Sequence, residues 1–266
     1  MEKNNINPDC LIFDVDGVLM EALESFPEMI RIVVEREWAR EGGVCDAPGY
    51  SLSHNAVFKR HGAFNDDYDI AWTLLNIAFT RGARLSLAIP SPGELERLLG
   101  GCGADCVSWL RANYEEKFDR DRIIALCESV YFGEDGNEGT WKLEKPKLRA
   151  SWRDLPLPAY VYTGRNTREW RMAQKALRWE DLPDERVINK DDGVAKPSPE
   201  GLARICRRFG HERPLFFGDT ASDREAARAF GHGWFAAIGS LLPDEPLRFD
   251  ETEEALRVLM GWRESK

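Results

Sequence analysis

The sequence predicts an α/β protein in which a parallel sheet is interrupted by a long, all-helical insertion. Short apolar runs each end in a polar residue followed by turn residues and a helix-like pattern, which is typical of a parallel sheet covered on both faces. Two helix starts are marked by an N-cap residue three positions before Glu, at Asn166 and Glu169 and again at Ser222 and Glu225. No convincing strand interrupts about 120 residues after the first run, far more than an ordinary β–α loop holds.

Five apolar runs are expected to form strands of the sheet. They are residues 10–13, 159–162, 187–188, 215–217 and 234–238. In open α/β sheets, ligands bind beyond the carboxyl ends of the strands. We therefore expect the reactive side chains that follow these runs to share one edge of the sheet: Asp14, Asp16, Thr163, Lys196 and Asp219.

The insertion carries apolar residues at helical spacing, and helices are expected over 25–41, 67–81, 92–99, 105–118 and 121–130. A segment of this length with its own apolar periodicity is interpreted as a separate domain. The predicted organisation is an α/β core formed by residues 1–20 and 141–266, with a helical domain over residues 21–140.

The composition of the chain indicates which binding partners and which cellular location to expect. The net charge of −10 argues against binding nucleic acid or anionic lipid. No apolar run approaches the ~20 residues of a membrane span, and the N-terminus lacks the basic flank and long apolar stretch of a signal peptide. A cytoplasmic location is expected. The six cysteines lack the usual spacing of zinc ligands and are interpreted as reduced thiols.

The turn Asp14-Val-Asp16-Gly17 places two carboxylates at the end of the first strand. A carboxylate can attack phosphorus when the phosphoryl charge is neutralised. A second, protonated carboxyl group can donate its proton to the leaving oxygen and later accept one from water. Gly17 permits a tight change of chain direction. A solvated acidic turn would produce the same pattern.

Asp219 and Asp223 supply two further carboxylates at another strand end. Oxygen ligands from separate strands are typical of Mg²⁺ sites, although an acid at position 223 would also suit the first turn of a helix. Thr163, with the amides that follow it at Gly164, can bind phosphoryl oxygens, and Lys196 can neutralise their charge. Taken singly, the threonine could be a helix cap and the lysine a surface residue.

Taken together, four motifs in order resemble the haloacid dehalogenase superfamily: DVDGV (14–18), TGR (163–165), AKPSPEGL (195–202) and GDTASDREAARAFG (218–231). The resemblance implies a Rossmann-like core, with Asp14 as nucleophile and Asp16 as general acid/base. It implies phosphate binding by Thr163, Gly164 and Lys196. It also implies Mg²⁺ held by Asp14, the main-chain carbonyl of Asp16 and Asp219, with Asp223 assisting.

Dehalogenases of this superfamily lack an acid at the position of Asp16, because a halide leaves without protonation. The second aspartate therefore favours phosphoryl chemistry. The insertion resembles the helical cap of phosphoglycolate-phosphatase-like members. The predicted function is a Mg²⁺-dependent phosphatase that hydrolyses a small phosphorylated metabolite through an aspartyl-phosphate.

Polar residues outside the core motifs are candidates for choosing the substrate: Lys59, Asn65, Asp66 and Arg165. Ordinary structural roles compete with this interpretation, since Lys59 suits a solvated helix face and Asp66 suits an N-cap.

Two other functions stay open. A phosphotransferase or sugar-phosphate mutase would use the same core, but mutase-like relatives carry a histidine soon after the first motif, and residues 20–36 contain none. A catalytically silent phosphate-binding module is disfavoured by the intact pair Asp14 and Asp16. The leaving group and the oligomeric state do not follow from the sequence.

Overall fold

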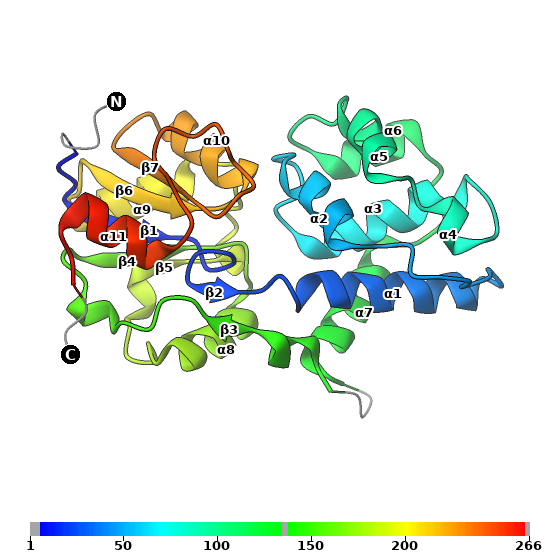
Figure 1. Cartoon of the computed structure of the whole chain (residues 1–266), viewed down its shortest axis with the longest axis horizontal. Helices are drawn as coiled ribbons and strands as arrows, with labels where there is room; N and C mark the ends of the chain where they lie inside the picture. The colour runs from blue at the N-terminus through cyan, green and yellow to red at the C-terminus, as the bar shows by residue number, and fades with distance from the viewer. Residues whose placement is uncertain (1–5, 135–137, 264–266) are drawn as a thin grey trace. The chain divides into compact units, whose positions relative to one another are not determined.

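A computed structural model of the chain describes residues 6–134 and 138–263 (Figure 1). The chain divides into two compact units. The core unit comprises Met1–Glu21 and Lys145–Lys266, and the inserted unit comprises Ala22–Glu144. We propose that these units are the two domains expected from the sequence.

Six strands among the described residues form a parallel sheet in the core unit. Their order is β5–β4–β1–β6–β7–β8, so β1 lies in the interior with a neighbour on each side (Figure 1). The predicted α/β class with a helical insertion is confirmed. The strands are β1 (Cys10–Phe13), β4 (Ala159–Tyr162), β5 (Val187–Ile188), β6 (Pro214–Gly218), β7 (Trp234–Ile238) and β8 (Arg248–Phe249).

The residues of β1 alternate between two hydrophobic cores. Leu11 and Phe13 join the core that includes side chains of α8 and α11. Cys10 and Ile12 join the core that includes side chains of α9 and α10. Because helices cover both faces, every residue of this strand is buried, which explains its unbroken apolar sequence. The helices are α8 (Thr167–Leu177), α9 (Glu200–Phe209), α10 (Ala221–Phe230) and α11 (Thr252–Met260).

One of the two predicted helix starts is confirmed. The capping box of α8 joins Asn166 and Glu169 as expected. The start predicted at Ser222 is wrong by two residues, because Thr220 is the N-cap of α10 and forms a capping box with Asp223. Thr220 is the N-cap because two hydrogen bonds join it to Asp223. Its side chain accepts the backbone N–H of residue 223, and the carboxylate of Asp223 accepts the backbone N–H of Thr220.

Helices form the inserted unit, as predicted. Within it, α1, α3 and α7 pack against one another. No helix of the described residues combines the length and the apolar character that crossing a membrane requires. The elements are α1 (Phe26–Arg40), α2 (Leu52–Lys59), α3 (Asp67–Phe79), α4 (Leu85–Ala88), α5 (Pro92–Leu99), α6 (Cys106–Asn113), α7 (Arg120–Phe132) and η2 (Thr140–Leu143).

The helix predicted over 105–118 ends earlier than expected. α6 stops at Asn113, and the backbone of Phe118 bonds to side chains of α3 instead of continuing a helix. Its N–H donates to Asn76 Oδ1 at 3.0 Å, and its carbonyl accepts from Trp72 Nε1 at 2.8 Å. These bonds satisfy the polar groups of two buried side chains of α3, and helical periodicity does not reveal such partners.

The segment after β1 is held in place within the core unit. Strand β2 (Met20–Glu21) pairs antiparallel with β3 (Lys145–Pro146), where the chain leaves and re-enters the unit. The hydroxyl of Thr252, at the start of α11, donates to the carbonyl of Val18 at 2.7 Å. This buried bond fixes the loop that carries the first motif. Neither feature was predicted, since β2 and β3 follow no apolar run and the bond of Thr252 joins residues 234 positions apart.

Candidate active site

Asp14 follows β1 directly and is almost fully buried, with 4% of the residue exposed. Its backbone N–H donates to the carbonyl of Phe217 in β6 at 2.9 Å, which fixes its position at the edge of the sheet. Burial raises the pKa of Asp14 to about 7; the charge of Lys196 opposes the rise, and the nearby carboxylates of Asp223 and Asp16 add to it.

Lys196 joins two of the aspartates. Its Nζ lies 2.8 Å from Oδ1 of Asp14 and 2.6 Å from Oδ1 of Asp223, and all three side chains are buried. Burial alone would lower the pKa of Lys196, but the two carboxylates reverse this effect and raise it. The side chain therefore carries a positive charge next to the predicted nucleophile, as a phosphate ligand requires.

Three carboxylates gather at this edge of the sheet. Oxygens of Asp14, Asp219 and Asp223 all lie within 4.8 Å of one another. The hard carboxylate oxygens come from the turn after β1 and from the β6–α10 segment, and they suit Mg²⁺, which takes carboxylate ligands and keeps several waters. The donor set therefore fits the ion expected from the sequence.

Asp223 also has the structural role that the sequence left open. Its Oδ2 accepts the backbone N–H groups of Asp219 at 3.2 Å and Thr220 at 3.0 Å, and the hydroxyl of Thr220 at 2.7 Å. Its other oxygen contacts Lys196. With both oxygens engaged, Asp223 is suited to orienting Lys196 and the Asp219 loop. Thr220 was missed as part of the site, although its place in the capping box was a usable signal.

Gly17 allows the first motif to lie against Asp219. Its φ is +70°, and a Cβ built at this position would lie 2.1 Å from Oδ2 of Asp219. The glycine is therefore required both by the left-handed backbone and by the close approach of the carboxylate. This contact brings the fourth motif onto the first one.

We expect Gly17→Ala to weaken Mg²⁺ binding roughly 10- to 100-fold, because the new methyl group must displace a predicted metal ligand. Calorimetric titration with MgCl₂ measures this change. Gly210→Ala is the matched control, since Gly210 has φ +73° and no atom within 4 Å of a built Cβ. The control carries only the left-handed backbone cost, about 1–2 kcal/mol of folding free energy. Equal Mg²⁺ affinity in both variants would contradict the prediction.

Thr163 and Gly164 follow β4, next to β1 in the sheet. Thr163 is buried; its N–H donates to the carbonyl of Ile188 at 3.0 Å, and its Oγ1 accepts the N–H of Arg165 at 3.2 Å. The hydroxyl therefore helps to shape the turn, whereas the helix cap that was considered as its alternative role belongs to Asn166. Phosphate binding by Thr163 and Gly164 stays a prediction.

Asp16 is paired with Arg165. The distance from Nη2 to Oδ1 is 2.6 Å, and Nε lies 3.2 and 3.3 Å from the two carboxylate oxygens. The arginine side chain is only 1% exposed, whereas the aspartate side chain is 31% exposed. Direct substrate contact by Arg165 stays a prediction.

The candidate specificity residues of the inserted unit have structural contacts. Nζ of Lys59 lies 2.8 Å from Oδ2 of Asp67, and Asp66 is the N-cap of α3, accepting the N–H of Tyr68 at 3.1 Å. Asn65 is half-buried just before this cap. Substrate contact by Lys59, Asn65 and Asp66 stays a prediction.

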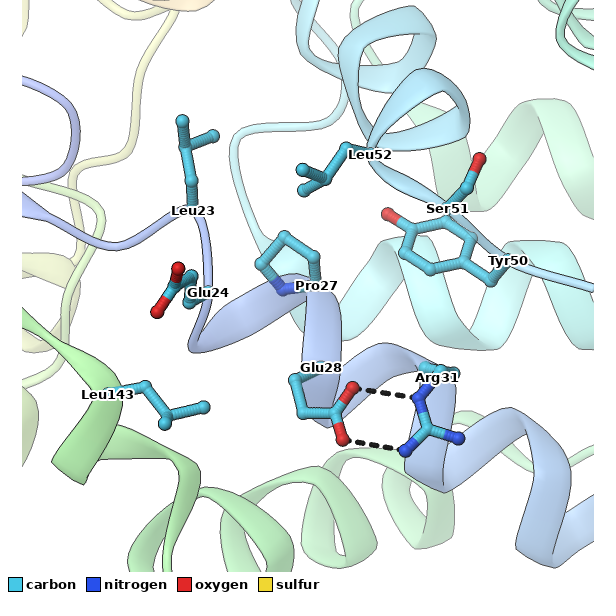
Figure 2. A pocket seen from close by; sticks show the side chains of 9 residues that line it. All are labelled: Leu23, Glu24, Pro27, Glu28, Arg31, Tyr50, Ser51, Leu52 and Leu143. Carbon is cyan, nitrogen blue, oxygen red and sulfur yellow. Dashed lines mark hydrogen bonds and ion pairs between the residues drawn. The ribbon is translucent and has the colours of Figure 1, made fainter. Parts of the chain in front are cut away.

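The inserted unit contains a pocket of about 400 Å³ that the sequence did not indicate (Figure 2). Glu28 and Arg31 form an ion pair at 2.6 Å on its wall, and exposed leucines form part of its lining. Lys59, Asn65 and Asp66 are not among its lining residues. The residues that line it are Leu23, Glu24, Pro27, Glu28, Arg31, Tyr50, Ser51, Leu52 and Leu143.

Comparison with solved structures supports the same fold. Phosphatase Tt82 from Thermococcus thioreducens matches with 22% identity and a TM-score of 0.65, over 95% of this chain and 99% of that one. A protein provisionally named phosphoglycolate phosphatase, from Lactobacillus delbrueckii subsp. bulgaricus, has 14% identity and a TM-score of 0.65, over 96% and 100% of the two chains. One provisionally named β-phosphoglucomutase, from Thermotoga maritima, has 17% identity and a TM-score of 0.53, over 95% and 99%.

A search of curated proteins finds no match to the chain. The family model for haloacid dehalogenase-like hydrolases matches residues 8–231, which include all four motifs and the whole insertion. With the parallel sheet and the cluster of aspartates around Lys196, this match leads to one conclusion. The chain belongs to the haloacid dehalogenase-like hydrolases.

Proposed function

We propose that the protein is a Mg²⁺-dependent phosphatase that hydrolyses a small phosphorylated metabolite through an aspartyl-phosphate on Asp14. The observation that carries this proposal is the buried cluster at the end of β1. There the Asp14 carboxylate contacts the Lys196 ammonium at 2.8 Å and lies within 4.8 Å of two further carboxylates. The net charge of −10 gives no support to nucleic acid as the substrate.

In the first step, an oxygen of Asp14 attacks phosphorus and the bond from phosphorus to the leaving oxygen breaks. Lys196 balances the phosphoryl charge, and the turn at Thr163 and Gly164 supplies further donors. Asp16 gives its proton to the leaving oxygen, so that the alcohol departs neutral. Mg²⁺, bound by Asp14, Asp219 and the carbonyl of Asp16, would neutralise charge on the phosphoryl oxygens.

In the second step, Asp16 accepts a proton from water while the water oxygen attacks the phosphorus of the aspartyl-phosphate. Inorganic phosphate leaves, and the carboxylate of Asp14 is regenerated. The partly exposed position of Asp16 suits both roles, because its carboxyl group must reach the leaving oxygen and then water.

A metabolite panel tests this function. The protein is incubated with phosphorylated sugars, acids and nucleotides, with MgCl₂ or with EDTA, and both released phosphate and the organic product are measured. We expect Mg²⁺-dependent phosphate release together with the free alcohol. An isomeric phosphate without phosphate release would instead indicate a mutase. No turnover of any substrate, including an aryl phosphate, would favour a binding module.

A further inference from the structure

Asp16 and Arg165 form an unequal pair across the site. Two nitrogens of the guanidinium group reach the carboxylate, with a shortest distance of 2.6 Å. The arginine is buried, whereas about a third of the aspartate side chain is exposed. One partner is therefore buried inside the core unit, and the other is partly exposed to solvent.

Arg165 also forms hydrogen bonds that do not involve Asp16. Its N–H donates to Oγ1 of Thr163 at 3.2 Å, and its carbonyl accepts the N–H of Lys190 at 3.0 Å. Its Nη1 lies 3.4 Å from the carbonyl of Glu169, in the first turn of α8. The guanidinium group thus has a defined position relative to the β4 turn and α8.

The backbone of Asp16 is already restrained without this arginine. Asp16 forms an isolated bridge with Met20, and the N–H of Gly17 donates to the carbonyl of Met20 at 2.8 Å. The ion pair therefore acts mainly on the orientation of the Asp16 side chain. A forked guanidinium group fixes both the position and the plane of a carboxylate, which a single ammonium group cannot do.

Proton transfer depends strongly on this orientation. The acid must lie within hydrogen-bond reach of the leaving oxygen, and a misplacement of about 1 Å can cost roughly 100-fold in rate. We propose that Arg165 is a positioning residue that holds Asp16 in the geometry for protonating the leaving group. The proposal rests on the phosphatase function proposed above. The competing explanation is that the pair only ties the β1 loop to the β4 turn.

A series of leaving groups separates these explanations. In Arg165→Gln, we expect kcat/KM for an alkyl phosphate to fall roughly 30- to 100-fold, the range that loss of oriented proton transfer produces. For 2,4-dinitrophenyl phosphate, whose leaving group departs without a proton, we expect a fall of less than about 5-fold. Arg165→Lys should lie between the wild type and Arg165→Gln. An equal fall for both substrates would overturn the proposal.

A double-mutant cycle with Asp16→Asn adds a second readout. If Arg165 acts through Asp16, the alkyl-phosphate activity of Arg165→Gln/Asp16→Asn equals that of Asp16→Asn alone. Multiplying losses would mean an independent structural role and would overturn the proposal. Thermal unfolding is measured for every variant, and if Arg165→Gln fails to fold, Arg165→Lys takes its place in the cycle.

Arg171→Gln is the matched control, since Arg171 lies on α8 and pairs with Asp184 at 2.7 Å in a solvent-exposed position. It should leave kcat/KM unchanged for both substrates. If the proposed phosphatase function itself is wrong, the wild-type protein will release no phosphate from either substrate. An active wild type with uniform losses in Arg165→Gln would contradict only the positioning role.

Discussion

Asp14→Asn is expected to lower phosphatase turnover by roughly four to six orders of magnitude, the loss that removal of a covalent nucleophile produces. The amide keeps the shape of the carboxylate but cannot attack phosphorus. Wild-type protein quenched in acid during turnover should gain the mass of one phosphoryl group on the peptide that contains Asp14. The variant should gain none. Initial rates with an aryl phosphate measure the loss.

Two controls show whether a loss of activity in Asp14→Asn comes from the missing nucleophile. The variant must remain folded, which a cooperative thermal transition establishes. Asp184→Asn is the control, because Asp184 is an exposed acid of the same unit with a side chain 72% accessible. Its activity should equal that of the wild type. Turnover that persists in Asp14→Asn would move the nucleophile to another residue.

The residues at the carboxyl edge of the sheet could be predicted from the sequence, because their placement there depends on local features. A continuous apolar run predicts a buried parallel strand, and the residue after it then lies at the carboxyl edge. Asp14 and Asp219 lie there because they follow β1 and β6, which are neighbours. Lys196 was expected at the same edge because it follows the apolar run 187–188, but its contacts with Asp14 and Asp223 were not predicted, since no strand ends directly at Lys196.

Other features depend on contacts between distant residues. Asp16 and Arg165 are separated by 149 positions, and nothing in either motif alone indicates that they pair. The early end of α6 depends on Asn76 and Trp72, which lie on another helix. The pocket of the inserted unit is formed by side chains from separate segments (Figure 2). A single sequence reveals helical periodicity but not which helix faces meet.

Loss of Lys196 is expected to have the largest effect on stability. Lys196→Met leaves the buried carboxylates of Asp14 and Asp223 facing each other without a cation. Breaking a buried ion pair by removing one partner costs about 3–5 kcal/mol of folding free energy. We also expect turnover to fall roughly 100- to 1,000-fold, because a donor to the transferring phosphoryl group is lost. Urea unfolding in EDTA measures the stability.

The folding stability of the wild type and of Lys196→Met should depend on pH in a direction set by the pKa of Asp14. Asp14 has a pKa of about 7 in the folded protein, above its ordinary value of 3.8, so the folded state binds more protons than the unfolded state between these values. Stability from this group therefore falls as pH rises from about 4 to about 7. Without Lys196 the carboxyl group ionises at still higher pH, and we expect the deficit of Lys196→Met to be small near pH 5 and larger near pH 8.

Magnesium should restore part of the folding stability that Lys196→Met loses. A divalent cation bound by Asp14 and Asp219 replaces part of the missing positive charge, so MgCl₂ should raise the unfolding midpoint of Lys196→Met more than that of the wild type. Lys175→Met, an exposed lysine on α8, is the control and should change stability by less than about 0.5 kcal/mol. A deficit in Lys196→Met that is independent of both pH and Mg²⁺ would mean that Lys196 contributes packing and not charge. The electrostatic account of the buried cluster would then be wrong, because it requires the two carboxylates to depend on a nearby cation.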